Sequence, residues 1–176
     1  DYRKELSALI ENGLEEAFAE PEITPNLDEE IRDVYKSHSP TLTSPASAIQ
    51  SKKRMVDAFS DGLRQSMERF DDLVIMGQDV AEYGGVFKIT DGFVDSFGKE
   101  RVRNTPICES GILSAALGLS IKGMKAVVEL QFADFVTSGF NPIINNLAKS
   151  HYRWGQNVDV TLRMPTGAGV GAGPFH

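Results

Sequence analysis

Apolar and polar positions alternate along residues 52–176 in blocks typical of strands and helices. Short apolar runs bounded by turn residues predict strands at 73–76, 101–107, 126–130 and 158–163. Helical spacing and helix-favouring composition predict helices over 55–70, 92–97, 110–121 and 135–152. Strands separated by helices indicate an α/β protein, a three-layer αβα fold with a mainly parallel sheet.

The first 35 residues have a different pattern. Residues 1–20 carry apolar side chains at helical spacing (Leu6, Leu9, Ile10, Leu14, Ala17 and Phe18), and Pro21 ends the predicted helix. A shorter helix is predicted over 28–35. Residues 36–51 are rich in Ser, Thr and Pro, which predicts a linker. We therefore expect a helical N-terminal extension over 1–35, a linker over 36–51 and a compact domain over 52–176.

Charge follows the same division. The net charge is −7, and residues 1–35 carry eleven acidic and three basic side chains, a net charge of −8. The remainder has fourteen acidic and fifteen basic side chains, so the domain has no basic face of the kind that binds nucleic acid. The acidic extension is interpreted as a solvated helical face, with a docking helix as the alternative.

Other sequence features narrow the class of protein. No run approaches the ~20 apolar residues that span a bilayer, and residues 1–20 lack the apolar stretch of a signal peptide. The single cysteine, Cys108, excludes an internal disulfide and a cysteine-based zinc site. We therefore expect a cytoplasmic protein without a membrane partner. The glycine-rich end, 167–173, fits neither the dinucleotide nor the phosphate-loop motif.

One carboxylate stands out at a predicted junction of strand and helix. Glu109 is the only charged side chain between Thr105 and Ile121. Burying an unpaired charge costs several kcal/mol, so this carboxylate needs a partner. A ligand is one candidate, and a helix cap or an ion pair is the other. Glu109, Gln131 and the loop after Arg163 all follow predicted parallel strands, whose carboxyl ends are where ligands bind in such sheets.

Several motifs, taken together, resemble a known family. They are Gly77-Gln-Asp-Val-Ala-Glu-Tyr-Gly-Gly-Val-Phe-Lys, Thr105-Pro-Ile-Cys-Glu-Ser-Gly-Ile, Glu129-Leu-Gln-Phe-Ala-Asp-Phe, Arg163-Met-Pro and Gly173-Pro-Phe-His. In this order they resemble the beta chain of thiamine-diphosphate-dependent 2-oxo acid dehydrogenases. The resemblance covers 52–176 and identifies a transketolase-like pyrimidine-binding domain, incomplete at its C-terminal end. Residues 1–35 resemble the tail of the family's alpha chain, so the sequence looks like a fragment of an alpha–beta fusion.

The resemblance implies roles for five residues. Glu109 is expected to be catalytic, bonding a pyrimidine ring nitrogen and exchanging a proton with it. Phe135 is expected to pack against the aminopyrimidine, Ile107 to touch it through its backbone, and Gln131 to hydrogen-bond the cofactor or a loop. His176 matches a catalytic histidine near the substrate carboxylate. Without the resemblance, Ile107 and Phe135 would be interpreted as core residues, Gln131 as a satisfied polar side chain and His176 as exposed.

The resemblance also implies a cofactor and partners. Thiamine diphosphate is expected, with its diphosphate and magnesium held by an alpha-type domain, because the Gly-Asp-Gly metal motif of that domain is absent here. No metal ligand is therefore assigned to this chain. A lipoyl acyltransferase core, a 2-oxo acid and further copies of the chain are the expected partners. The Glu129–Phe135 motif favours branched-chain substrates such as 2-oxoisovalerate. The alternatives are a pyruvate dehydrogenase, another transketolase-like enzyme, or a non-catalytic assembly domain.

Overall fold

The structure is a computed structural model that describes residues 1–42 and 44–167. The chain divides into two units, Asp1–Asp33 and Val34–His176. Within the described residues, no helix is both long enough and apolar enough to cross a membrane.

The first unit is helical and solvent-exposed. Helix α1 (Tyr2–Ala19) begins after Asp1, whose carboxylate accepts a hydrogen bond from the Arg3 N–H at 3.1 Å, and it ends before Pro21. None of its residues is buried, so its predicted apolar stripe lies on the surface. Helix α2 (Leu27–Val34) follows, with the Asn26 side chain accepting from the Glu29 N–H at 3.3 Å. Between 36 and 51 the described residues form no helix or strand.

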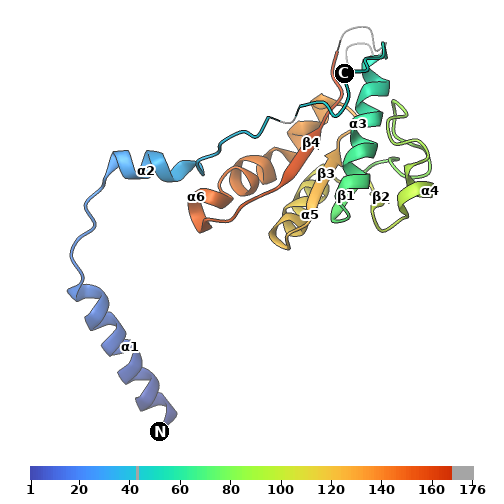
Figure 1. The fold of residues 1–176 in the computed structure, drawn as a ribbon. Coiled ribbons are helices and arrows are strands. Elements are labelled where there is room, and N and C mark those ends of the chain that lie inside the picture. Colours follow the sequence, from blue (N-terminus) through green and yellow to red (C-terminus); the bar gives the residue numbers. More distant parts are fainter. Residues whose placement is uncertain (43, 168–176) are drawn as a thin grey trace. The chain divides into compact units, whose positions relative to one another are not determined.

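The second unit is built on a four-stranded parallel sheet (Figure 1). Its strands, in the spatial order β2-β1-β3-β4, are β1 (Leu73–Gly77), β2 (Val102–Asn104), β3 (Lys125–Glu129) and β4 (Val160–Arg163). Gly77 is in register with Asn104 on one side and Glu129 on the other, and Glu129 is in register with Arg163. The carboxyl ends of all four strands therefore lie along one edge of the sheet.

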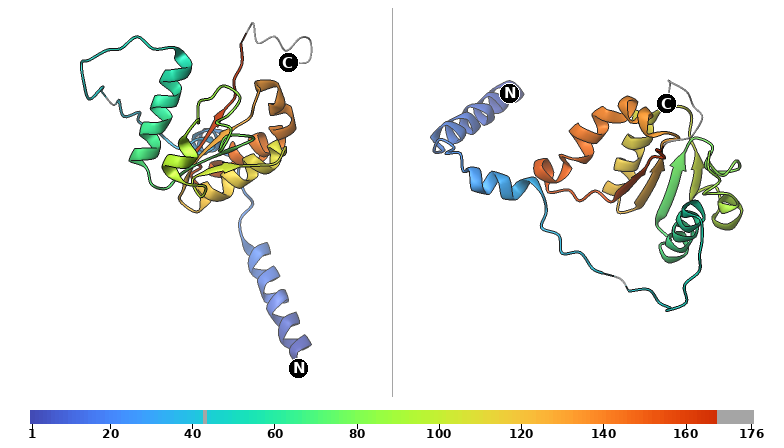
Figure 2. Two further views of the ribbon diagram at one scale, coloured as in Figure 1. Left: turned by 90° about the vertical axis from the view of Figure 1, so that its right-hand side faces the viewer. Right: turned by 90° about the horizontal axis from the view of Figure 1, so that it is seen from above.

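Helices cover both faces of this sheet (Figure 2). Val74, Met76, Ala126 and Val128 face α5 (Glu109–Ile121) and pack against its buried side chains Ile112, Leu113 and Ala116. Leu73 and Ile75 face the other way, toward α3 (Met55–Arg69) and α4 (Phe93–Phe97), and pack against Met67 and Phe93. Alternate residues of one strand thus enter two cores, and the predicted three-layer α/β fold is confirmed.

The predicted long helix over 135–152 is wrong. The segment forms three short helices: η1 (Ala133–Gly139), η2 (Pro142–Leu147) and α6 (Ser150–Trp154). Pro142 has no N–H to continue a preceding helix, so it starts a new one. In η2 the Ala148 N–H reaches the Ile143 carbonyl at 2.9 Å, which is the wider π-helical spacing.

The predicted strand over 101–107 is also shorter in the structure. β2 ends at Asn104, and the Thr105 N–H makes one more bond, to the Gly77 carbonyl at 2.9 Å. Pro106 then offers no donor, and the chain leaves the sheet. Helix α5 begins at Glu109, one residue earlier than predicted, so Glu109 belongs to the first turn of the helix.

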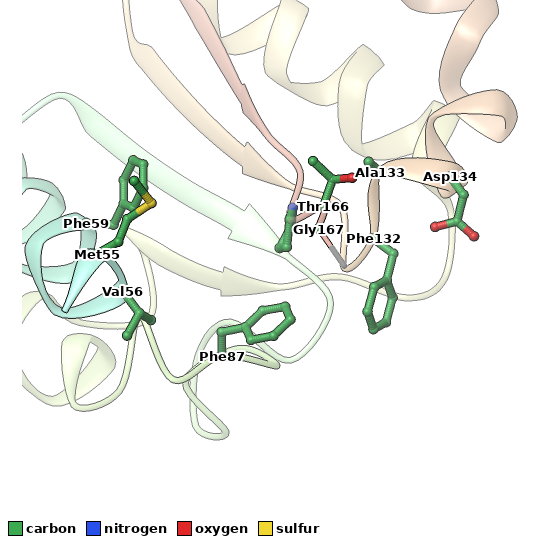
Figure 3. Close-up of a pocket in the computed structure, with 10 residues that line it drawn as sticks. Met55, Val56, Phe59, Phe87, Phe132, Ala133, Asp134, Thr166 and Gly167 are labelled. Atoms are coloured by element: carbon green, nitrogen blue, oxygen red, sulfur yellow. The ribbon is translucent and has the colours of Figure 1, made fainter. Parts of the chain in front are cut away.

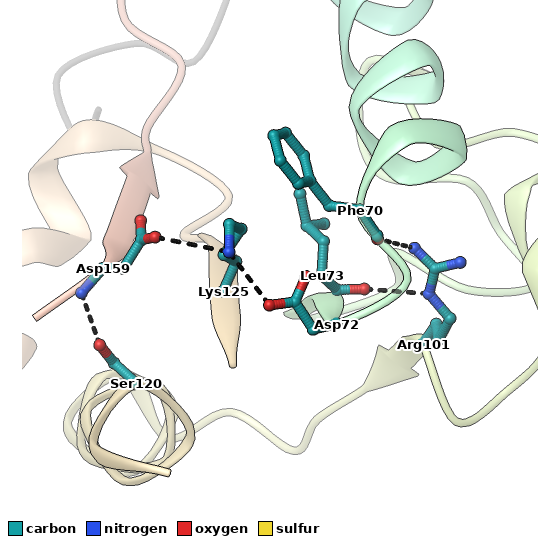
Figure 4. A network of polar contacts seen from close by, with 7 residues as sticks. All are labelled: Phe70, Asp72, Leu73, Arg101, Ser120, Lys125 and Asp159. Carbon is teal, nitrogen blue, oxygen red and sulfur yellow. Dashed lines mark hydrogen bonds and ion pairs between the residues drawn. The ribbon is translucent and has the colours of Figure 1, made fainter. Parts of the chain in front are cut away.

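Charged side chains close the amino-terminal edge of the sheet (Figure 4). The Lys125 ammonium lies 3.0 Å from the Asp72 carboxylate and 4.0 Å from that of Asp159. Nearby, the Arg101 guanidinium donates to three backbone carbonyls where α3 passes into β1, at 2.6–3.1 Å: those of Met67, Phe70 and Leu73. These contacts tie the end of α3 to the start of β1, and they give the Met67 carbonyl, in the last turn of the helix, a donor.

Candidate functional site at the carboxyl edge of the sheet

Glu109 lies at the carboxyl edge, where β2 passes into α5. Its side chain is half-buried and makes no hydrogen bond or ion pair with any other residue that the structure describes. The main chain of η1 lies close by, because a Cβ added at Gly139 would lie 3.6 Å from the Glu109 Cβ and 2.4 Å from Leu113 Cδ1. The positive end of the helix dipole favours a carboxylate in this first turn. The main chain and Cβ of Glu109 are therefore held against η1, and its carboxyl group is available to a ligand.

The loop before Glu109 offers further contacts. Ile107 is 83% exposed, so interpreting this residue as part of the core is wrong. Thr105, which the sequence did not single out, has a buried hydroxyl oxygen without a hydrogen-bond partner in the described part of the chain. A buried hydroxyl usually has a partner. A hydroxyl residue directly before a proline, inside the predicted strand over 101–107, was the available signal for it.

Gln131 follows β3 and is held by a side chain from the end of β1. Its Nε2 donates to Asp79 Oδ2 at 3.1 Å. Because a carboxylate can only accept, this bond fixes the amide orientation and leaves the Gln131 carbonyl oxygen to face other groups. Asp79 itself has φ of +57°, a left-handed conformation that Asp adopts more readily than most residues. The structure thus brings together two polar side chains from neighbouring strand ends.

Phe135 belongs to a row of three aromatic rings. It packs edge-on against Phe132, with ring centroids 5.8 Å apart and planes at 90°. Phe132 in turn packs against Phe87, with centroids 6.3 Å apart at 76°. Edge-to-face pairs at these distances hold their members in defined orientations. Phe132, which the sequence analysis did not select, therefore helps to hold the Phe135 ring in place.

A cavity of ≈ 420 Å³ lies beside this row (Figure 3). Phe87 and Phe132 face Met55, Val56 and Phe59 of α3 across it. Its remaining lining comes from Ala133, Asp134, Pro165, Thr166 and Gly167. Phe132 lines this cavity, whereas Glu109, Ile107, Gln131 and Phe135 are not among its lining residues. Of the predicted residues, Phe135 reaches this cavity only indirectly, through its ring contact with Phe132.

Glu129, the last residue of β3, is a buried acid that the sequence analysis passed over. It is 2% exposed, and its carboxylate accepts a hydrogen bond from Arg163 Nη2 in an ion pair. Burial raises the pKa of Glu129 above its ordinary value, and Arg163 acts in the opposite direction. The signal was a charged residue inside an apolar run, Ala126-Val-Val-Glu-Leu. His176, the other predicted catalytic residue, lies outside the described residues.

Comparisons with known proteins agree with this architecture. The family described as "Transketolase, pyrimidine binding domain" matches residues 51–176. This chain belongs to the transketolase pyrimidine-binding domain family. The match contains every element of the sheet and all of the predicted site residues, so the family resemblance predicted from the motifs is confirmed.

Relatives of this pyrimidine-binding domain are beta subunits of 2-oxo acid dehydrogenases. It is 39% identical over 140 residues to the pyruvate dehydrogenase E1 component subunit beta of Leifsonia xyli subsp. xyli, covering 78% of this chain and 41% of the relative. It is 41% identical over 124 residues to the 2-oxoisovalerate dehydrogenase subunit beta of Pseudomonas aeruginosa, covering 69% and 35%. A pyruvate dehydrogenase beta subunit from Staphylococcus epidermidis is 40% identical, with coverage of 69% and 38%. The chain thus spans about two-fifths of these relatives' length.

Proposed function

We propose that this chain supplies the pyrimidine-binding half of a thiamine-diphosphate-dependent 2-oxo acid dehydrogenase. The observation that carries the proposal is Glu109, a half-buried carboxylate without a side-chain partner among the described residues. It stands at the strand edge where α/β sheets bind ligands, in a chain of the pyrimidine-binding family. An acid group held this way suits proton exchange with a ring nitrogen.

The residues at this edge fit an aminopyrimidine. Such a ring has apolar faces and an edge of nitrogen donors and acceptors. Phe135 offers an apolar surface, Glu109 an acid, and Gln131 a carbonyl oxygen oriented by Asp79. The buried Thr105 hydroxyl oxygen, without a partner among the described residues, adds a further polar group beside the same loop.

Each residue is proposed to have a limited task. When bound, thiamine diphosphate supplies the carbanion and the electron sink for decarboxylation. Glu109 gives a proton to the pyrimidine nitrogen and takes it back, Phe135 sets the plane of the ring, and Gln131 fixes its rotation. Ile107 contributes backbone groups beside Glu109. We retain His176 as the proposed catalytic residue for the substrate carboxylate, on the basis of its sequence motif.

The remaining machinery is proposed to come from partners. An alpha-type portion would hold the diphosphate and magnesium, a lipoyl acyltransferase core would accept the acyl group, and paired copies would complete the sites. Pyruvate and branched-chain 2-oxo acids are the candidate substrates. We favour 2-oxoisovalerate because of the Glu129–Phe135 motif, and the relatives include beta subunits of both pyruvate and 2-oxoisovalerate dehydrogenases.

Calorimetric titration of the complete enzyme with thiamine diphosphate and magnesium tests the proposal. We expect saturable binding by the wild type and clearly weaker binding by Glu109→Ala. Glu68→Ala is the matched control, since Glu68 is an exposed carboxylate on α3. No binding by the wild type would favour a non-catalytic assembly domain. Steady-state comparison of 2-oxoisovalerate with pyruvate, with a lipoyl domain as acceptor, then decides the substrate and separates this enzyme from a transketolase-type synthase.

A further inference from the structure

The Glu129 carboxylate has an unusual environment for a buried acid. One oxygen, Oε2, is paired with the Arg163 guanidinium. The other, Oε1, is buried and has no hydrogen-bond partner among the residues described. A buried polar atom without a partner costs stability. The contact between Glu129 and Arg163 therefore does not by itself explain why this ion pair is buried here.

Three segments of the chain meet at this carboxylate: β3, β4 and the loop that follows β1. Glu129 ends β3, and its backbone is in register with Gly77 of β1 and Arg163 of β4. The turn at Gly84 and Gly85 lies against it: a Cβ added at Gly85 would lie 3.3 Å from Oε1 and 3.8 Å from Oε2. Gly85 also has φ of +76°, which favours glycine.

The same three segments continue into the aromatic row and the walls of the cavity. The turn leads to Phe87, β3 leads to Phe132, and β4 leads to Pro165 and Thr166. Backbone bonds keep the last two segments paired beyond the strands, with the Leu130 N–H on the Arg163 carbonyl at 3.1 Å and the Ala133 N–H on the Pro165 carbonyl at 3.0 Å. Figure 3 shows Phe87 and Phe132 on the same side of the cavity.

Stability alone does not account for this arrangement. Well-packed apolar side chains often replace a buried ion pair without loss of stability. What an apolar pair lacks is a directional bond that fixes how the ends of two strands sit relative to each other. The buried ion pair, at the point where the three segments meet, provides such a directional bond.

We propose that Glu129, through Arg163, is a positioning residue for the aromatic row Phe87–Phe132–Phe135. The inference rests on the proposed function, because it assumes that Phe135 packs against the cofactor's pyrimidine. Glu129 acts at a distance: it holds the ends of β3 and β4 and the glycine turn, these hold Phe132, and Phe132 orients Phe135 by edge-to-face contact.

The experiment replaces the pair by apolar residues in the complete enzyme, as Glu129→Met together with Arg163→Leu. We expect an unfolding midpoint equal to or above that of the wild type, and a dissociation constant for thiamine diphosphate raised about tenfold. The single variant Arg163→Lys keeps a cation beside Glu129, so it should retain most of the wild-type affinity for thiamine diphosphate. The matched control is Asp72→Leu with Lys125→Met, an ion pair that ends on the first residue of the same strand; it should leave affinity unchanged.

Two outcomes would overturn the inference. One is a stable double variant that binds thiamine diphosphate within twofold of the wild type. The other is an equal loss of affinity in the Asp72–Lys125 control. If the double variant does not fold, Glu129→Gln, which keeps the shape of the side chain, takes its place and should weaken binding severalfold. Failure of the wild type to bind at all would refute the proposed function, and this result is distinct from both.

Discussion

The two ends of one parallel sheet differ in how their polar groups are satisfied. At the amino end, Lys125 lies between Asp72 and Asp159, and Arg101 donates to three carbonyls. At the carboxyl end, Glu109 has no side-chain partner among the described residues, and the buried oxygens Thr105 Oγ1 and Glu129 Oε1 have none either. The amino end serves the fold, whereas the carboxyl end is where we propose that a ligand binds.

Backbone conformation follows the same division. The loop beyond β1 contains the two non-glycine residues with positive φ in the described chain, Asp79 and Lys88 at +57°. It also contains Gly84 and Gly85, where a side chain would meet Asp91 and Glu129. Unfavourable conformations of this kind persist where the surrounding structure holds them, and they gather at functional sites. The two ends of the sheet therefore differ in backbone geometry as well as in side chains.

The largest effect is expected from Glu109→Gln in the complete enzyme. The amide keeps the size of the side chain but cannot exchange a proton as an acid does. We expect the rate of decarboxylation to fall by about 10²–10⁴-fold, with an unchanged unfolding transition. Steady-state turnover and circular dichroism on the same samples measure both. Wild-type turnover in this variant would remove Glu109 from the site.

Arg163→Met is expected to have the next largest effect, this time on stability. It leaves the Glu129 carboxylate buried without its cation, since Glu129 is 2% exposed. Breaking one side of a buried pair costs about 3–5 kcal/mol. Urea denaturation at neutral pH should show this loss. Lys125→Met, at the other end of the sheet, should show a much smaller one because its ion pairs are partly solvated. Equal losses of unfolding free energy in the two variants would contradict the difference between the two ends of the sheet.

Sequence patterns predicted the sheet well because its strands are short apolar runs between turn residues. They predicted Glu109 as a candidate because a lone charge in an apolar segment is visible without a structure. They did not reveal Glu129, whose partner Arg163 is far away in sequence and becomes a neighbour only through the register of β3 and β4. They also missed the link between Gln131 and Asp79 for the same reason.

The failures of local prediction have local causes. The segment over 135–152 was predicted as one helix, yet Gly139 packs against Leu113 and Pro142 cannot donate, so three short helices form. Ile107 looked like a core residue because it ends a β-prone run. The preceding Pro106 turns the chain away from the sheet, and the side chain is exposed. In both places a proline decided the structure against the apolar pattern.

Arg101→Ala should be somewhat milder than Arg163→Met. The variant removes donors from the carbonyls of Met67, Phe70 and Leu73, where α3 passes into β1. Met67 and Leu73 are buried, whereas Phe70 and Arg101 are half-buried, so water can replace only part of the contact. We expect a loss of about 2–3 kcal/mol and no change in cofactor affinity. Urea denaturation and calorimetric titration measure the two quantities, and a loss of affinity with intact folding would contradict the division between the two ends.

The smallest expected effect is on the pH dependence of stability. Acids at the two ends of the sheet should contribute to it with opposite signs. Lys125 holds the pKa of Asp72 below its usual range, by its hydrogen bond first and its charge second. Burial raises the pKa of Glu129, against the effect of Arg163. Asp72 therefore adds stability above its unfolded pKa of ~3.9, and this stability is lost as the pH falls through the lower folded value. Glu129 does the opposite, since its penalty is absent below its unfolded pKa of ~4.3 and grows as the pH rises toward its folded pKa.

Urea denaturation from pH 3 to pH 8 of the wild type, Asp72→Asn and Glu129→Gln tests these signs. The difference in unfolding free energy between the wild type and Asp72→Asn should grow as the pH rises from 3. The difference between the wild type and Glu129→Gln should change in favour of the variant as the pH rises above ~4.3. If the two differences changed with pH in the same direction, the Glu129 charge would be stabilised in the fold as the Asp72 charge is. The charges at the carboxyl end would then be as well paired as those at the amino end. Opposite slopes would show that the fold tolerates an unfavourable charge only at the end of the sheet where a ligand is proposed to bind.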